Sequence, residues 1–233
     1  MKLATLADLN TERAARRPAI VVTDTASGEQ RLVKARDFAA DPLRAELANA
    51  LRMGKSGMVE VSGKKLFLNV YAPTARLVII GAVHISQALA PMAQSLGYDV
   101  TVVDPRTAFA SAERFPDVPL IAEWPDEALP PLNIDHYTAF VALTHDPKID
   151  DPALLHAFQR DCFYIGALGS RKTHGKRGER LKAQGAKESD IARIHAPIGL
   201  AIGAVSPSEI AVSIMAEITA ALRLPPKAQE AAA

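Results

Sequence analysis

The segment at residues 76–106 constrains the fold of this chain more than any other part of the sequence. An apolar, β-branched run at residues 76–80 is followed by a turn that begins at Gly81. Apolar residues with helical spacing then cover residues 85–96, and a second β-branched run covers residues 100–103. This order of strand, glycine turn, helix and strand is typical of the first half of a Rossmann-type unit, which builds a parallel sheet.

The same alternation continues along the chain. Short apolar runs, of the kind that are buried on both faces of a parallel sheet, predict further strands at residues 120–122, 139–143 and 163–167. Helices are predicted between them, one opening at residues 151–152 and one opening at Ser170. Together these segments predict an α/β fold, a Rossmann-like parallel sheet with flanking helices.

The last helix has the clearest start signal. Ser206 and Glu209 are spaced as a capping box, and Pro207 stands at the first helical position. The residues that follow are apolar except for one narrow polar stripe formed by Glu209, Ser213 and Glu217. This pattern predicts that the last helix is largely buried.

The first 74 residues form a different pattern, that of a small α+β module. Alternating and β-branched runs on either side of two glycine turns predict two hairpins, at residues 19–34 and 57–71. A helix between them is predicted from Pro42 to Gly54. The chain is therefore expected to divide into three parts, a module at residues 1–74, a Rossmann-like domain at residues 75–224 and a disordered tail at residues 225–233.

Charge and cysteine content argue against several classes of protein. The chain of 233 residues carries 27 basic and 26 acidic residues, and its net charge of +1 gives no general attraction to nucleic acid or to an anionic membrane. We expect neither a membrane span nor secretion, because no run approaches roughly 18 apolar residues and the first residues hold no long apolar stretch. Cys162 is the only cysteine, which excludes an internal disulfide and a multi-cysteine metal site. We expect a cytoplasmic protein with no metal site.

The turn at Gly81 departs from the dinucleotide fingerprint G-x-G-x-x-G. Its second and third glycine positions are occupied by Val83 and Ser86, where glycine normally admits a pyrophosphate and lets helix and strand pack closely. The helix N-terminus behind Gly81 still offers N–H groups to an anion. His84 is either a ligand contact or a residue that bonds a neighbouring loop. NAD(P) is therefore less favoured as a ligand, and the alternative is a nucleotide site that Val83 has filled.

Asp104 and Arg106 follow the second strand of this unit. Asp104 stands 23 residues after Gly81, which is where the acid of a dinucleotide fold binds the ribose hydroxyls. An acid at this position favours NAD over NADP. We expect Gly81, His84, Asp104 and Arg106 to form one wall of a ligand site.

His145 and Asp146 follow the apolar strand at residues 139–143. Ligands of open α/β folds bind at the carboxyl edge of the sheet, so these side chains are placed where function is expected. They can orient a ligand or a water, but two residues are too few to define a metal site. The alternative is loop capping, with Asp150 or Asp151 as a helix N-cap.

Gly169, Ser170 and Arg171 repeat the arrangement of strand, glycine turn and helix start, now with cations. Gly169 permits close approach of the backbone, Ser170 can cap the helix or bind an oxyanion, and Arg171 can grip a phosphate. This is the strongest anion-binding signal in the sequence. The alternative is a solvated basic helix face, because further cations continue past the turn.

Taken together, these segments resemble the xanthine dehydrogenase accessory protein family, XdhC/CoxI, over residues 76–223. The resemblance is carried by the following motifs, whose joint order and spacing are specific: Gly81-Ala-Val-His84, Val102-Val-Asp104-Pro-Arg106, Arg114-Phe-Pro116, Leu143-Thr-His145-Asp146, Tyr164-Ile-Gly166-Ala-Leu-Gly169-Ser170-Arg171-Lys172, Pro197-Ile-Gly199-Leu and Pro207-Ser-Glu209-Ile-Ala-Val-Ser-Ile. The family's usual turn is similar to Gly-x-Gly-His, whereas in this chain Val83 stands in place of the second glycine. Its first 75 residues also lack the glycine-rich and cysteine-bearing segments associated with the family's N-terminal domain.

The resemblance implies an accessory, chaperone-like role without catalytic residues. Family members bind molybdenum cofactor, protect it during sulfuration and deliver it to molybdenum hydroxylases such as xanthine dehydrogenase. For this chain it implies that Gly169, Ser170 and Arg171 hold the phosphate of the cofactor, and that His145, Asp146 and Arg106 orient the remainder. A client hydroxylase, a cysteine desulfurase and a second copy of the chain in a homodimer are the expected partners.

Two other functions remain open from the residues themselves. One is an NAD(P)-dependent oxidoreductase, supported by Asp104 and opposed by Val83. The other is a non-enzymatic interaction module whose nucleotide site has decayed. The sequence does not specify an enzyme class, because it holds no P-loop, no cysteine pair and no Ser-His-Asp order.

Overall fold

A computed structural model describes residues 1–225 of the chain. The described chain forms two compact units, one of Met1–Pro73 with Arg223–Pro225 and one of Thr74–Leu222. The tail expected to be disordered lies, from residue 226 onward, outside the described residues. Within residues 1–225, no helix is long and apolar enough to cross a membrane.

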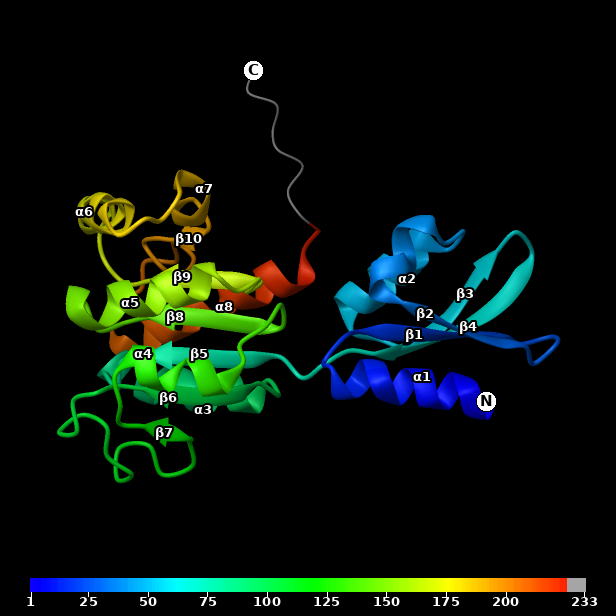
Figure 1. The fold of residues 1–233 in the computed structure, drawn as a ribbon, viewed down its shortest axis with the longest axis horizontal. Helices are drawn as coiled ribbons and strands as arrows, with labels where there is room; N and C mark the ends of the chain where they lie inside the picture. Colours follow the sequence, from blue (N-terminus) through cyan, green and yellow to red (C-terminus); the bar gives the residue numbers. More distant parts are fainter. Residues whose placement is uncertain (226–233) are drawn as a thin grey trace, which may run out of the picture. The chain divides into compact units, whose positions relative to one another are not determined.

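The N-terminal unit is a four-stranded antiparallel sheet with the strand order β2-β1-β4-β3 (Figure 1). Its elements are α1 (Leu3–Ala14), β1 (Ala19–Asp24), β2 (Gln30–Lys34), the 3₁₀ helix η1 (Ala35–Ala40), α2 (Arg44–Met53), β3 (Gly57–Val61) and β4 (Lys64–Tyr71). Helix α1 packs Leu9 against one face of the sheet, while η1 and α2 pack Phe38 and Leu47 against the other. Both predicted hairpins are present, and Gly54 ends α2 in the left-handed conformation.

Two helical segments of this unit differ from the prediction. Helix α1 was not predicted, because only Leu9 and Glu12 of its side chains are buried and the segment therefore carries little periodic signal. Helix α2 begins at Arg44 and not at Pro42. The Asp41 carboxylate accepts a hydrogen bond from the N–H of Leu43 and pairs with Arg31, which holds the preceding turn outside the helix.

The second unit contains a six-stranded sheet in the order β10-β9-β8-β5-β6-β7, and all pairs in it are parallel. Its strands are β5 (Arg76–Ile80), β6 (Asp99–Val103), β7 (Leu120–Ile121), β8 (Thr138–Ala142), β9 (Tyr164–Ala167) and β10 (Ile194–His195). The order from β7 through β5 to β10 is that of a Rossmann fold. The predicted fold class, a Rossmann-like parallel sheet preceded by a small α+β module, is confirmed.

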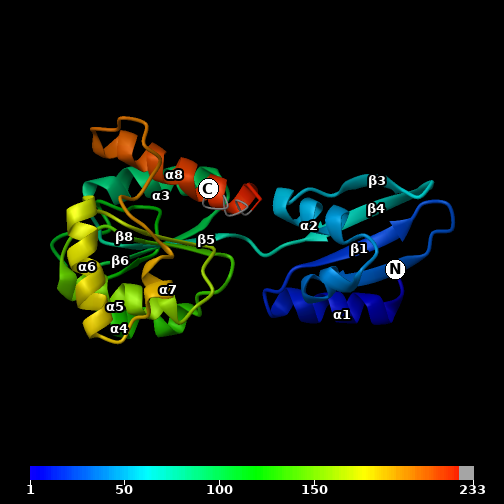
Figure 2. The ribbon, with the colours of Figure 1, turned by 90° about the horizontal axis from the view of Figure 1, so that it is seen from above.

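Helices cover both faces of this sheet (Figure 2). They are α3 (His84–Ser95), α4 (Pro125–Ala128), the 3₁₀ helix η2 (Pro130–Leu132), α5 (Pro147–Phe158), α6 (Arg171–Ala183), α7 (Glu188–Ile191) and α8 (Pro207–Arg223). Helices α3 and α8 pack on one face, and α4, α5, α6 and α7 pack on the other. Because both faces are covered, the central strands are apolar throughout, and every residue of β8 is buried.

Two helices of the second unit correct the sequence predictions. Helix α5 begins at Pro147, four residues earlier than expected, because Asp146 caps it by accepting the N–H of Lys148. Helix α8 is not largely buried, since its buried residues lie along one face and Val212 is 48% exposed. Within its polar stripe, Ser213 is only 3% exposed, whereas Glu209 is exposed.

Candidate functional site

Five loops meet at the carboxyl edge of the second sheet, because its strands all run in the same direction. They follow β6, β5, β8, β9 and β10 in their spatial order across the sheet. The chain reverses its direction of winding between β5 and β8, and α/β folds bind ligands at such a switch point. All nine residues expected from the sequence to contact a ligand lie in the loops after β6, β5, β8 and β9 or at the helix starts that follow them.

The Gly81 turn is packed tightly against the loop after β8. Gly81 has a φ of 113°, and a Cβ at this position would lie 2.8 Å from Cγ2 of Thr144. The backbone of Gly81 therefore lies close to Thr144, with no room for a larger side chain. His84 begins α3 and is exposed, and it makes no hydrogen bond with the described residues.

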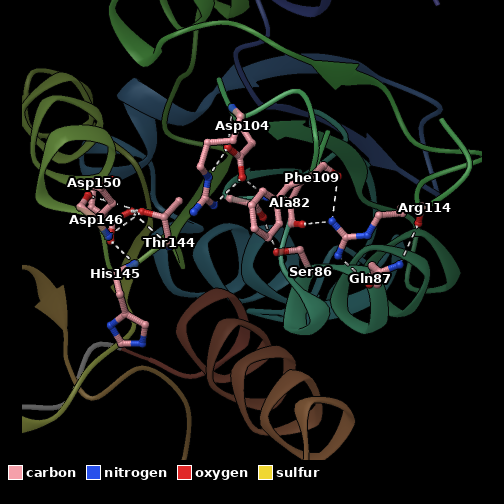
Figure 3. Close-up of polar contacts among 12 residues, drawn as sticks. Ala82, Ser86, Gln87, Asp104, Phe109, Arg114, Thr144, His145, Asp146 and Asp150 are labelled. Atoms are coloured by element: carbon pink, nitrogen blue, oxygen red, sulfur yellow. Dashed lines mark hydrogen bonds and ion pairs between the residues drawn. The ribbon is translucent and has the colours of Figure 1, made fainter. Parts of the chain in front are cut away.

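Asp104 is fully buried and bound by its own chain (Figure 3). Its carboxylate accepts the N–H of Ala82 at 2.7 Å, and it accepts Nε and Nη2 of Arg106 at 2.9 and 2.7 Å. Burial opposes ionisation, but these hydrogen bonds lower the pKa of Asp104 below its usual value. Asp104 and Arg106 therefore hold each other, and the carboxylate is not directed at a ribose.

Arg114 fixes the other side of the same turn. Its Nη1 donates to the carbonyl oxygens of Ala82 and Phe109, both at 2.8 Å, and its Nη2 donates to Gln87 at 3.0 Å (Figure 3). With Asp104 on its N–H and Arg114 on its carbonyl, Ala82 has both backbone groups occupied. Ala82 therefore offers no free backbone N–H to a dinucleotide pyrophosphate, which needs free N–H groups and close approach.

The loop after β8 holds His145 in an uncommon backbone conformation. His145 has a φ of 62°, a left-handed value that costs free energy in a residue other than glycine. Asp150 stabilises it by accepting the N–H of His145 at 3.1 Å and the hydroxyl of Thr144 at 2.7 Å. The His145 ring extends away from Asp150 (Figure 3). The N-cap of α5 is Asp146, whereas the alternative drawn from the sequence placed it at Asp150 or Asp151, which both lie inside the helix.

Asp150 and Arg177 link this loop to the next one, and the sequence did not single out either of them for a ligand site. Each is only 2% exposed, and Nη2 of Arg177 lies 4.0 Å from the Asp150 carboxylate. The same Nη2 donates to the carbonyl of Leu168 at 2.8 Å. Burial raises the pKa of Asp150 and lowers the pKa of Arg177. In the sequence, Asp150 is one candidate for a helix N-cap and Arg177 is one of several cations in a basic helix, so no pattern indicates that they pair.

The turn at Gly169 combines a left-handed glycine, a capped helix start and an exposed cation. Gly169 has a φ of 134°, and a Cβ there would lie 3.0 Å from Cγ2 of Thr173 and 3.7 Å from Cε1 of His145. Ser170 caps α6 by accepting the N–H of Thr173 at 3.2 Å. Arg171 is exposed and makes no ion pair with residues 1–225. The structure thus places His145 beside Gly169, which Ser170 and Arg171 follow in the chain.

Arg177 adds positive charge behind this turn. Its Nε and Nη1 are buried and have no hydrogen-bond partner within residues 1–225. Two unbonded nitrogens of a buried guanidinium favour an acceptor nearby, and the first-turn N–H groups of α6 lack partners within the helix. The residues present therefore fit a phosphate group at Gly169. No group of three metal-binding side chains occurs in the described part of the chain.

Comparison with known proteins decides the family. Residues 77–218 match the model of the XdhC Rossmann domain, which is more than half of the chain. The chain belongs to the XdhC family. In this XdhC protein the Rossmann domain includes all five loops at the carboxyl edge, so the resemblance seen in the sequence is confirmed.

Three relatives and one solved structure resemble this XdhC protein. "Uncharacterized protein YqeB" of Escherichia coli is 33% identical over 72% of this chain and 32% of its own length. A probable xanthine dehydrogenase subunit from Bacillus subtilis is 32% identical over 66% of this chain and 44% of its own. "Molybdenum cofactor insertion chaperone PaoD" of Escherichia coli is 33% identical over 66% and 42%. This XdhC protein thus spans less than half the length of these relatives.

The solved structure is described as a xanthine dehydrogenase from Bacillus halodurans. It matches with a TM-score of 0.68 and 24% identity, covering 94% of this chain and 66% of the other. At this identity the likeness shows the fold alone. Because the uncovered share of this XdhC protein is smaller than its N-terminal unit, the shared fold extends into that unit, whose sequence had looked atypical for the family.

Proposed function

We propose that this protein is an accessory protein for a molybdenum hydroxylase of the xanthine dehydrogenase type, and that it binds molybdenum cofactor for sulfuration or insertion. Its membership of the XdhC family supports the accessory role. Two relatives support the cofactor and the client, since one is named as a molybdenum cofactor insertion chaperone and the other as part of a xanthine dehydrogenase.

The observation that carries the cofactor-binding part is the turn at Gly169. A phosphate group is held there by the free N–H groups that begin α6 and by the side chain of Arg171. The buried guanidinium of Arg177 reinforces the positive potential at the same place. His145 lies against Gly169 and orients the rest of the ligand.

The bound cofactor supplies the redox chemistry of the client enzyme, and the residues of this protein bind and orient it without covalent chemistry. Asp146 takes part through the helix that it caps. Arg106 is paired with Asp104, and this removes it from the set that holds the ligand. In this proposal the Gly81 turn borders the ligand site without binding the phosphate.

The client hydroxylase is the partner that receives the cofactor. A cysteine desulfurase is the partner expected for sulfuration, and the proposal places all these steps in the cytoplasm. A homodimer is the expected state of this chain. None of these partners requires the Gly81 turn to bind a nucleotide.

The test is an anaerobic titration of the purified full chain with molybdenum cofactor. Wild type is expected to bind at micromolar concentration, and Arg171→Ala is expected to weaken binding at least tenfold, or about 1.4 kcal/mol. The matched control is Lys176→Ala, an exposed cation one helical turn further along α6. A folded wild type that fails to bind contradicts cofactor handling. Capture of the client hydroxylase by Arg171→Ala would then favour a non-enzymatic interaction module.

A further inference from the structure

One carboxylate on the α8 side of the sheet gathers three hydrogen-bond donors. Oε2 of Glu217 accepts the hydroxyl of Tyr164 at 2.6 Å and the N–H of Gly199 at 2.7 Å. Its Oε1 lies 3.0 Å from Nδ1 of His195. Glu217 thus ties together β9, β10 and the loop that leads into α8.

These contacts fix which nitrogen of His195 faces outward. Burial opposes ionisation of Glu217, but hydrogen bonds from His195, Tyr164 and Gly199 lower the pKa of its carboxyl. An ionised Glu217 requires a proton on Nδ1 of His195, so Nε2 is the free acceptor of the neutral ring. Within residues 1–225, Nε2 has no hydrogen-bond partner.

The His195 ring is held on one face and open elsewhere. It stacks on Tyr164 with ring centroids 4.6 Å apart and an interplanar angle of 30°. Tyr164 is 1% exposed, and the side chains of Glu217 and His195 are 17% and 41% exposed. A buried tyrosine and a mostly buried carboxylate therefore orient an imidazole that solvent and ligands can reach.

His195 lies on β10, which is next to β9, and the chain continues from β9 into the turn at Gly169. His195 pairs with Gly166 in the parallel register, three residues before Gly169. A Cβ at Gly166 would lie 2.5 Å from Cδ1 of Ile198, so the loop after β10 packs directly on β9. The same loop exposes Leu200 by 44%. The adjacent strands β9 and β10 and the loops that follow them thus carry the turn at Gly169, Nε2 of His195 and the exposed Leu200.

We propose that Nε2 of His195 accepts a hydrogen bond from a ring N–H of the bound pterin, while Leu200 contacts the flat ring system. The inference rests on the proposed function and assigns the recognition of the ring, which that function leaves open. A planar, nitrogen-rich heterocycle carries both the N–H donor and the apolar face that this arrangement requires. Glu217 and Tyr164 are positioning residues that do not touch the ligand.

Two small probes test the ring site and the phosphate site separately in the full chain. The probes are 6-hydroxymethylpterin, which carries no phosphate, and inorganic phosphate. His195→Phe keeps an aromatic ring for stacking on Tyr164 but removes both nitrogens. It is expected to weaken pterin binding at least tenfold and to leave phosphate binding unchanged. Arg171→Ala is expected to do the opposite.

The NMR signals of the His195 ring provide a direct readout, because they would not respond to the pterin if His195 had only a structural role. In wild type, addition of 6-hydroxymethylpterin is expected to shift the Nε2 resonance more than that of Nδ1, which stays bonded to Glu217. His195→Gln, which retains a polar group, checks that loss of binding does not reflect loss of the fold. An Nε2 signal that does not respond to the pterin up to its solubility limit overturns the inference.

The intact cofactor distinguishes this inference from the proposed function. If wild type binds the cofactor and His195→Phe binds it equally well, the ring contact is wrong and the proposed function stands. If wild type does not bind the cofactor, the proposed function is wrong. A shift of the His195 signals with inorganic phosphate alone would assign this imidazole to an anion and also overturn the ring contact.

Discussion

Arg106 grips Asp104 through two parallel hydrogen bonds of 2.9 and 2.7 Å, at the position where a dinucleotide fold presents its acid to a ribose. The guanidinium also stacks over Phe109 with its central carbon 4.5 Å from the ring centroid. Asp104 in turn holds the N–H of Ala82, which a pyrophosphate would need. The Asp104 carboxylate and the N–H of Ala82, which a dinucleotide would bind, are thus already bonded within the chain.

Wild type is accordingly expected to bind NAD and NADP with a Kd above about 1 mM, which corresponds to about 4 kcal/mol of binding free energy. Val83→Gly is expected to remain above the same limit. It restores the second glycine of the fingerprint but leaves Ala82 bonded to Asp104 and Arg114. Isothermal titration calorimetry measures both proteins. Micromolar affinity in wild type would show that the closed turn opens for a nucleotide.

Gly169→Ala is expected to destabilise the protein by about 1–3 kcal/mol, because alanine is strained at a φ of 134°. Its Cβ would also lie only 3.0 Å from Cγ2 of Thr173, which displaces the start of α6 and weakens phosphate binding. The matched control is Gly175→Ala in the same helix, where a Cβ meets open space and stabilises by about 0.5–1 kcal/mol. Thermal unfolding and a phosphate titration measure the two effects. Equal stability of the two variants would contradict this account of the turn.

Arg177→Met is expected to cost about 1–3 kcal/mol at pH 7, because it leaves the buried Asp150 carboxylate without its cation. The pKa of Asp150, already raised by burial, rises further. With the folded pKa above the unfolded one, the folded state takes up the proton first, so stability returns as pH falls below neutrality. Denaturant unfolding at several pH values measures this. The double variant Asp150→Asn/Arg177→Met should lack the recovery, and a recovery of equal size there would assign it to another group.

Much of the fold was predictable, because β-branched runs and helical periodicity report burial directly. The strands β5, β6, β8 and β9 follow continuous apolar runs, and α3 follows an apolar stripe. The two-residue strand β10 and the helix α1 were not predicted. Each buries too few side chains to leave a pattern in the sequence.

The position of the candidate site was predictable from the sequence, but the contacts between its side chains were not. Glycine turns and helix starts located Gly169 and Ser170 correctly as a turn and an N-cap. No sequence pattern indicates that Arg106 turns back onto Asp104, since that depends on the path of the loop after β6. The partners of Glu217 were not predicted either, because helical periodicity identifies a polar stripe without showing what each of its side chains contacts.

The N-terminal unit is expected to lose stability in acid through Glu12. Hydrogen bonding to Arg17, with the nearby charges of Arg36 and Lys34, lowers the pKa of this carboxyl from 4.5 to about 2. Because the folded pKa lies below the unfolded one, the stabilisation is complete above about 4.5 and is lost as pH falls toward 2. Glu12→Gln should therefore be less stable than wild type at pH 7, and the difference should shrink at pH 3 in thermal unfolding. The exposed Glu60→Gln is the control, and a wild-type loss no steeper than that of Glu12→Gln would rule out this carboxylate as the source.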